Sequence, residues 1–337
     1  MIKYSYLIAS YCLIIISLCA CRQRESSVQT GSDGYILVQD WPNLSKDFVL
    51  GNPTGLGIDS KSNIVVFHRA SRVWQSPMPV DKIQENTILV LNKQTGKVIR
   101  HWGANLFIVP HGLEVDKEDN IWVTDVALHQ VFKFSAEGEL LLTLGEAAVP
   151  GTDANHFNLP TDVAVADDGS FYVSDGYGNS RVVKFAADGT YLLEWGSLGK
   201  ESGEFKTPHG IDLDKYGNVY VADRENNRIQ KFNAEGKFIS LWQNSRTDQL
   251  YSVVIDHKHD QLFGIDYMTH LFGAMVVGSD IFRFDLDLTP QVKFGRSGSY
   301  NGAKARYHDV LVDDEGSIYV GDIYGNQIQK FRMEEGR

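Results

Sequence analysis

Cysteine is nearly absent from the chain, and its distribution is informative. All three cysteines, Cys12, Cys19 and Cys21, lie within the first 21 of the 337 residues. The rest of the sequence can therefore form no disulfide bond and no thiolate metal site, even if the protein is exported to an oxidising compartment.

Clusters of basic residues are also absent. The chain has 32 Lys and Arg against 43 Asp and Glu, which gives a formal net charge of -11 at pH 7. An acidic chain without a basic run is poorly suited to bind the phosphates of nucleic acids or of anionic lipids. We therefore expect no nucleic-acid partner.

A long apolar run occurs only at the N-terminus. The segment MIKYSYLIASYCLIIISLCAC, residues 1–21, has one positive charge, Lys3, before its apolar run. This pattern is typical of a secretory signal and is short for a membrane-spanning helix. Its end, Leu18-Cys19-Ala20-Cys21, resembles the lipobox of bacterial lipoproteins, in which cleavage precedes a cysteine that then carries the lipid. A plain signal peptide and a short anchor helix are the alternatives.

The lipobox reading predicts where the protein resides. Residues 1–20 would be a lipoprotein signal peptide, and residues 21–33 would be a flexible tether, because that segment is polar and lacks aromatic residues. The protein would be exported and held on a membrane only through the lipid on Cys21, on the periplasmic or cell-surface side.

The remaining sequence is built from one repeated pattern. Each repeat has a short alternating strand, a turn rich in Asp, Gly, Asn and Lys, and a second strand rich in β-branched and aromatic residues. The six copies are PTGLGIDSKSNIVVFH (53–68), PHGLEVDKEDNIWVTD (110–125), PTDVAVADDGSFYVSD (160–175), PHGIDLDKYGNVYVAD (208–223), YSVVIDHKHDQLFGID (251–266) and YHDVLVDDEGSIYVGD (307–322). Most copies continue into a third and a fourth strand. Four strands repeated six times at roughly 40–57 residues predict an all-β fold, a six-bladed β-propeller.

The sixth repeat lacks a fourth strand of its own. An otherwise unassigned strand, GYILVQDWP (34–42), lies at the start of the folded part. We predict that this N-terminal strand completes the last blade and closes the ring. Residues 34–337 then form one β-propeller, which we expect to be a monomer.

Histidine recurs at one position of the repeat. The six equivalent positions hold Thr54, His111, Thr161, His209, Tyr251 and His308. Alternate blades of a six-fold ring lie about 120° apart, and this position begins the innermost strand, so the three imidazoles should converge at one end of the channel. Three neutral nitrogen ligands with an open fourth position indicate a catalytic zinc site. The alternative is that the histidines were merely copied with the repeat, although the Thr and Tyr residues between them show that copying was selective.

The end of the second strand supplies further candidates. Five repeats place an aspartate there, which we interpret as a structural turn carboxylate: Asp125, Asp175, Asp223, Asp266 and Asp322. His68 replaces it in the first repeat. Nearby, Arg69, Tyr177 and Arg224 should lie on the rim of the same channel mouth. An arginine can hold a substrate carboxylate, and a phenol can carry a proton if a metal or an arginine lowers its pKa.

Long strings in these repeats resemble a known enzyme family. The strings are VFHRASRVW (66–74), VPHGLEVDKEDNIWVTDVALHQVFKF (109–134), NHFNLPTDVAV (155–165), YVSDGYGNSRVVKF (172–185) and YVADRENNRIQKF (220–232). They are similar to peptidyl-α-hydroxyglycine α-amidating lyase, the second catalytic domain of the peptide-amidating monooxygenase, within the wider group of NHL-repeat propellers. The resemblance implies a carbon–nitrogen lyase that cleaves a substrate with a free α-hydroxyglycine-like end into an amide and glyoxylate.

The same resemblance implies cofactors and residue roles. It implies a catalytic zinc ion held by His111, His209 and His308. It implies Tyr177 as a catalytic residue with Arg69 and Arg224 near the substrate. It also implies a structural calcium ion held by the side chain of Asp309 and the main-chain carbonyls of Leu56 and Leu113, and hard oxygen ligands suit calcium.

Two departures and two rival functions remain. Gly178 stands where animal members have a cysteine, and Arg306 precedes the third histidine where the family has Met-x-Pro-His, which leaves the substrate shape open. One rival is another metal-dependent enzyme on the same site, such as a lyase for a small carbinolamide or a lactonase. The other is a non-catalytic NHL propeller that binds a peptide, glycan or protein. The lyase ranks first because the matching strings include the site residues and not only the scaffold.

Overall fold

The computed structural model describes residues 34–46, 48–244, 249–270, 275–295 and 305–334. The predicted signal peptide, the predicted tether and the predicted lipidation site Cys21 lie outside the described residues. Among the residues described, none belongs to a helix that is both long and apolar enough to cross a membrane.

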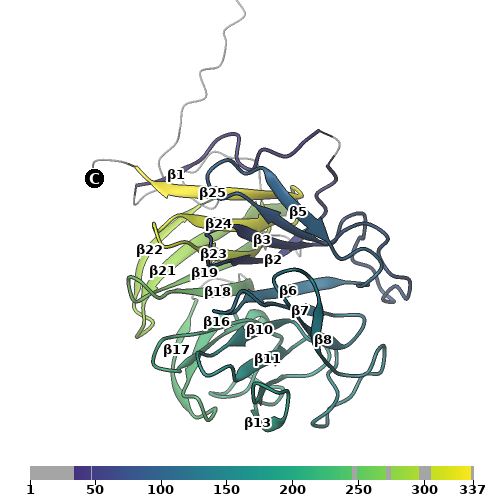
Figure 1. Cartoon of the computed structure of the whole chain (residues 1–337). Helices are drawn as coiled ribbons and strands as arrows, with labels where there is room; N and C mark the ends of the chain where they lie inside the picture. The colour runs from purple at the N-terminus through teal and green to yellow at the C-terminus, as the bar shows by residue number, and fades with distance from the viewer. Residues whose placement is uncertain (1–33, 47, 245–248, 271–274, 296–304, 335–337) are drawn as a thin grey trace, which may run out of the picture.

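Six antiparallel sheets form the blades of a propeller, and their innermost strands gather in the middle of the molecule (Figure 1). This confirms the predicted all-β, six-bladed architecture. From the axis outward, the strands of blades one to three are β2 (Pro53–Ile58), β3 (Ile64–His68), β4 (Ile88–Leu91) and β5 (Val98–Trp102); β6 (Pro110–Val115), β7 (Ile121–Asp125), β8 (Gln130–Phe134) and β9 (Leu140–Leu144); and β10 (Asp162–Val165), β11 (Phe171–Asp175), β12 (Arg181–Phe185) and β13 (Tyr191–Trp195).

Blades four to six follow the same order, with one irregularity. Their strands are β14 (Pro208–Leu213), β15 (Val219–Asp223), β16 (Arg228–Phe232) and β17 (Phe238–Gln243); β18 (Gln249–Asp256), β19 (Gln261–His270), β21 (Asp280–Asp285) and β22 (Pro290–Gly295); and β23 (Tyr307–Val312), β24 (Ile318–Asp322), β25 (Gln327–Met333) and β1 (Tyr35–Leu37). Blade five departs from the predicted four strands, because β19 runs beyond the blade and pairs with an added strand, β20 (Met275–Gly278).

The place of a strand in its blade is visible in its sequence. Five of the second strands, β3, β7, β11, β15 and β24, are buried along their whole length, as in β7 with the sequence IWVTD. A strand covered on both faces reads as a continuous apolar run, and these strands lie between neighbouring blades. The outer strands β5 and β13 instead alternate between half-buried and exposed residues, as expected for a strand with one face in solvent.

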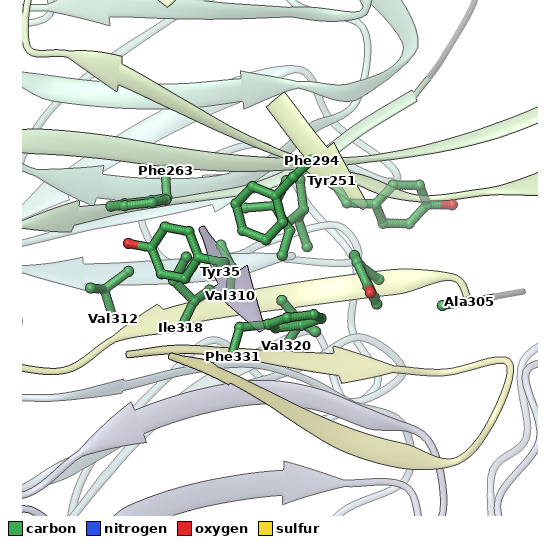
Figure 2. Packing of buried hydrophobic residues seen from close by; sticks show 13 residues of the cluster. Tyr35, Tyr251, Phe263, Phe294, Ala305, Val310, Val312, Ile318, Val320 and Phe331 are labelled. Atoms are coloured by element: carbon green, nitrogen blue, oxygen red, sulfur yellow. The ribbon is translucent and has the colours of Figure 1, made fainter. Parts of the chain in front are cut away.

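The N-terminal strand closes the ring as predicted. β1 pairs antiparallel with β25, with Tyr35 opposite Met333 and Leu37 opposite Phe331. Tyr35 also stacks on Phe294 of blade five, with ring centroids 4.9 Å apart and nearly parallel planes (Figure 2). The first strand of the domain is therefore fixed by backbone hydrogen bonds to the last blade and by apolar packing between blades five and six.

The repeated aspartates are structural, as predicted. Asp125 accepts hydrogen bonds from the backbone N–H groups of Ile108 and Val109 through one oxygen and of Ala127 and Leu128 through the other, at 2.7–3.0 Å. These carboxylates thus tie the loop that enters each blade to the turn after its second strand. The equivalent residues that also accept from a backbone N–H of the entering loop are Asp175, Asp223 and Asp322. Asp266 differs, because it accepts from the N–H of Asp280 at the start of β21.

His68 takes over this role in blade one. Its Nδ1 accepts a hydrogen bond from the N–H of Ala70 at 3.1 Å, as Asp125 accepts from Ala127. Burial lowers the pKa of His68 to about 4, so the imidazole is neutral in the folded protein near pH 7.

This substitution predicts a pH-dependent loss of stability. His68 has a lower pKa folded than unfolded, so the unfolded chain takes up a proton first as the pH falls through 6.5 towards 4. The free energy of unfolding should therefore fall by about 2 kcal/mol between pH 7 and pH 5 through this residue. His68→Asn keeps an acceptor for Ala70 but does not titrate. In urea unfolding the wild type should lose more stability over this range than His68→Asn, and equal losses would contradict the assignment.

Candidate metal centre and active-site cavity

Three histidines lie at irregular points of the innermost strands. The register of β6, β14 and β23 shifts next to His111, His209 and His308, because each strand contains a residue more than its partner requires. Such a bulge interrupts the alternation of side chains and redirects the residue that it contains.

The three imidazoles converge as the sequence predicts. Their ring centroids lie 4.6–4.9 Å apart, and one ring nitrogen from each lies within 4.8 Å of the other two. All three side chains are buried. Within the described parts of the chain, this is the one cluster of His, Cys, Asp or Glu with the spacing of metal ligands.

Backbone carbonyls fix the orientation of each imidazole. Nδ1 of His111 lies 2.6 Å from the carbonyl oxygen of Thr161, Nδ1 of His209 lies 2.7 Å from that of Tyr251, and Nδ1 of His308 lies 3.0 Å from that of Thr54. A carbonyl can only accept, so Nδ1 carries the proton in each ring and Nε2 keeps its lone pair.

The protonation state also suits a metal. Burial lowers the pKa of all three histidines well below the usual value, and the Arg69 and Arg224 guanidiniums add to this effect at His111. The rings are therefore neutral at pH 7. Three neutral imidazoles, each anchored through Nδ1, fit a divalent metal of the zinc type bound through Nε2.

Tyr177 and Arg224 meet at this cluster. Tyr177 follows β11, and its hydroxyl lies 3.1 Å from Nε2 of His111 and 3.0 Å from Nε2 of His209. Arg224 opens the 3-10 turn η1 (Arg224–Asn226), and its Nη1 donates to the Tyr177 hydroxyl at 3.1 Å. The structure thus places a phenol between the histidines and a guanidinium.

The environment of the phenol differs in part from the expectation. Burial raises the pKa of Tyr177, while the Arg224 and Arg69 guanidiniums act in the opposite direction. Arginine therefore does not by itself produce a phenolate at neutral pH. Further positive charge next to the hydroxyl is needed for that state.

Arg69 completes the rim. Its Nε donates to the carbonyl oxygen of Pro110 at 3.0 Å, and its guanidinium lies 5.1 Å from the centre of the Trp74 ring. Its Nη2 is buried and has no hydrogen-bond partner in the described structure. Burial lowers the pKa of Arg69 to about 10, so it remains charged at pH 7 and can bind an anion.

These groups open into one cavity of about 480 Å³ at the channel mouth. A separate surface hollow of 620 Å³ along residues 71–85 contains none of the predicted site residues. The cavity is lined by Asn52, Arg69, Val73, Trp74, Tyr177, Arg224, Tyr251, Arg306, His308, Ile323 and Tyr324.

Sequence reasoning had not assigned several of these residues to the site. Trp74 lies 5.0 Å from the Tyr177 ring, between β3 and β4, and the unusual length of that connection was the available signal. Tyr251 shares the register position of the histidines, and its carbonyl oxygen holds His209.

The residues predicted to hold calcium also lie together, deeper in the channel. Asp309 accepts hydrogen bonds from the N–H of Leu56 and from the hydroxyl of Ser252, both at 2.7 Å. Leu113 lies on β6, which packs directly against β2 at Gly55, where an added Cβ would come within 2.5 Å of the Leu113 side chain.

Known proteins share this sequence pattern and this fold. The sequence matches the NHL repeat over residues 157–185 and 205–232. It is 42% identical over 309 residues to a probable peptidyl-alpha-hydroxyglycine alpha-amidating lyase of Caenorhabditis elegans, covering 86% of this chain and 85% of that protein. It is 37% identical over 321 residues to peptidyl-glycine alpha-amidating monooxygenase B of Xenopus laevis, covering 87% of this chain. The chain spans only 35% of that relative's length.

A solved structure shares the fold. A streptogramin B lyase aligns with a TM-score of 0.54 and 17% identity over 86% of this chain and 95% of that one. At this identity the likeness supports the propeller fold alone.

Metal binding gives a direct test of the histidine cluster. We expect the purified protein to retain about one zinc ion per chain after dialysis, and His209→Ala to lose it, because two remaining nitrogens bind the ion far more weakly. His101→Ala, at an exposed position on β5, is the matched control and should keep the metal. Equal zinc content in both variants, measured by atomic emission, would contradict the assignment.

Proposed function

The chain belongs to the peptidyl-α-hydroxyglycine α-amidating lyase family of NHL-repeat propellers, and from that membership we propose that it is a carbon–nitrogen lyase. Its substrate would be a peptide or small molecule that ends in α-hydroxyglycine, and its products an amide and glyoxylate. The observation that carries the proposal is the Tyr177 hydroxyl, within 3.1 Å of two of the three inward-facing histidines.

The reaction needs no co-reactant. R-CO-NH-CH(OH)-COO⁻ becomes R-CO-NH₂ and OHC-COO⁻. The carbinol O–H bond and the C–N bond break, and a carbon–oxygen double bond and an N–H bond form. The protein must therefore accept a proton from the hydroxyl, return one to the amide nitrogen and hold the carboxylate in place.

His111, His209 and His308 would hold the zinc ion. When bound, zinc would supply a Lewis acid that makes a bound hydroxyl more acidic and adds the positive charge that the buried phenol requires. The anchoring of each Nδ1 on a carbonyl keeps Nε2 directed to that position.

The remaining steps fall to the residues around the cavity. Tyr177, as a phenolate, would take the proton of the carbinol hydroxyl and later deliver it to the departing nitrogen. Arg224 donates to the Tyr177 oxygen at 3.1 Å and would stabilise its negative charge. Arg69, with its buried and unpartnered Nη2, would hold the substrate carboxylate.

We further propose that calcium binds deeper in the channel, through the side chain of Asp309 and the carbonyls of Leu56 and Leu113. The charge of the channel supports a divalent cation there. Burial raises the pKa of Glu114, Asp162 and Asp212, and neighbouring carboxylates add to the effect at Glu114 and Asp162. A cation among these groups would offset charge that the fold otherwise leaves uncompensated.

We also propose a site of action, which rests on the lipobox-like end of the N-terminal segment. Export and lipidation at Cys21 would place this reaction on the outer side of a membrane, with the propeller attached through residues 21–33.

Removal of one hydroxyl group tests the chemistry. We expect the wild type to release glyoxylate from α-hydroxyhippurate, and Tyr177→Phe to lower kcat at least about 100-fold, since it removes the group that transfers the proton. Tyr216→Phe, at an exposed position, is the control and should turn over normally. Full turnover by Tyr177→Phe would show that another group carries the proton. Cleavage of lactones without glyoxylate release would select the lactonase instead.

Addition of calcium tests the structural ion. In zinc-loaded protein freed of calcium, Ca²⁺ should raise the melting temperature by several degrees, because a ligand at 100 times its Kd stabilises the native state by about 2.7 kcal/mol. Asp309→Asn should abolish this shift, while Asp287→Asn, an exposed aspartate, should keep it. A Ca²⁺ shift that survives in Asp309→Asn would place the ion elsewhere.

A further inference from the structure

Three guanidiniums share the active-site cavity, although the chain as a whole carries a net charge of -11. Arg224 pairs with Glu225 at 3.0 Å. Arg69 and Arg306 form no ion pair with any described residue. The cavity therefore holds more positive charge than its own carboxylates neutralise, and more than a single substrate carboxylate requires.

Arg69 would bind the first anion, which is the carboxylate of the α-hydroxyglycine. This residue is almost fully buried, and its Nη2 lacks a hydrogen-bond partner among the described residues. It lines the cavity together with His308 and Tyr177. A substrate carboxylate at this point would satisfy the buried donor and lie beside the metal ligands.

Arg306 is held at a different place by aromatic rings. Its Nε and Nη2 donate to the hydroxyl of Tyr251. Its guanidinium lies 5.3 Å from the centre of the Tyr251 ring and 4.8 Å from that of Tyr267. These contacts fix the orientation of the guanidinium without neutralising its charge.

Tyr251 separates this arginine from the catalytic one. The guanidinium of Arg224 lies 5.2 Å from the Tyr251 ring and 5.0 Å from the Tyr177 ring. The cavity wall thus alternates phenol and guanidinium, with Arg224 next to the histidines and Arg306 beyond Tyr251. A ligand whose first carboxylate lies on Arg69 can therefore place a second negative charge on Arg306 in the same cavity.

The backbone of Arg306 is also fixed. Its N–H donates to Asp322 at 2.8 Å, and the next residue but one is the metal ligand His308. The side chain therefore starts from a rigid strand end beside the metal centre, as a group that selects a substrate requires.

We propose that Arg306 binds an acidic side chain on the residue that precedes the α-hydroxyglycine, so that the preferred substrates end in Asp or Glu followed by α-hydroxyglycine. The inference rests on the proposed lyase function. Once the α-hydroxyglycine carboxylate is on Arg69 and its hydroxyl is at Tyr177, the acyl residue is the part of the substrate that extends along the cavity wall towards Arg306. A planar guanidinium with free N–H groups matches a carboxylate there.

The test uses two substrates of nearly equal shape. N-acetyl-Glu-α-hydroxyglycine and N-acetyl-Gln-α-hydroxyglycine differ in one charge, and the full zinc-loaded chain is assayed for glyoxylate release. We expect kcat/KM to favour the Glu substrate about tenfold, mainly through KM, as one charge-assisted hydrogen-bonded pair allows. Arg306→Gln should reduce this ratio to about one, and Arg306→Lys should retain part of it. Arg332→Gln removes an exposed positive charge outside the cavity and should leave the ratio unchanged.

Binding of unreactive analogues separates this inference from the proposed function. N-acetyl-Glu-Gly and N-acetyl-Gln-Gly lack the hydroxyl group, so their affinities, measured by calorimetry, do not depend on turnover. Tighter binding of the Glu analogue that is lost in Arg306→Gln would support the anion site even if no substrate released glyoxylate. Glyoxylate release with a Glu to Gln ratio near one, or a preference that persists in Arg306→Gln, would overturn the role of Arg306 and leave the lyase intact.

Discussion

The geometry of the histidine cluster depends on hydrogen bonds between neighbouring blades. Each of the three histidines is oriented by the backbone carbonyl of the residue at the same register position in the next blade, namely Thr161, Tyr251 and Thr54. A blade that supplies a carbonyl in this way need not supply an imidazole. The alternation of histidine with Thr or Tyr around the ring thus has a physical reason: one blade contributes the imidazole and the next contributes the carbonyl that orients it.

This arrangement requires a closed ring. His308 lies in blade six and its carbonyl partner Thr54 in blade one, so their contact spans the two ends of the domain. The pairing of β1 with β25 and the stacking of Tyr35 on Phe294 fix the last blade close to that junction. Loss of closure would therefore displace one imidazole from the other two, and the proposed chemistry depends on a strand that lies far from it.

The repeat made much of this predictable from sequence. A residue that recurs at one position of the repeat occupies the equivalent position in each blade of the ring. For this reason His111, His209 and His308 could be assigned to one cluster. For the same reason Asp125 and its counterparts could be interpreted as structural. Closure of the ring by β1 could also be predicted, because the sixth repeat lacks a fourth strand and one unassigned strand lies at the start of the domain. The family resemblance then supplied roles for Tyr177, Arg69 and Arg224 that register alone could not.

The remaining features lie where the repeat is broken. Trp74 reaches the cavity from an insertion between the second and third strands of blade one, and β20 lies in an insertion at the same position of blade five. Arg306 was visible as an unusual neighbour of His308, but its position in the cavity depends on its packing against Tyr251 and Tyr267. The bulges beside the histidines could not be predicted from the alternation of apolar and polar residues along a strand, because a bulge interrupts that alternation.

The central claim, that the histidine cluster is the catalytic metal centre, is tested most directly by titrating metal-free protein with zinc while glyoxylate release from α-hydroxyhippurate is measured. The account predicts no release without metal and a rise that saturates at about one zinc ion per chain. Release at full rate by metal-free protein, or saturation of the site with zinc without any release, would contradict it.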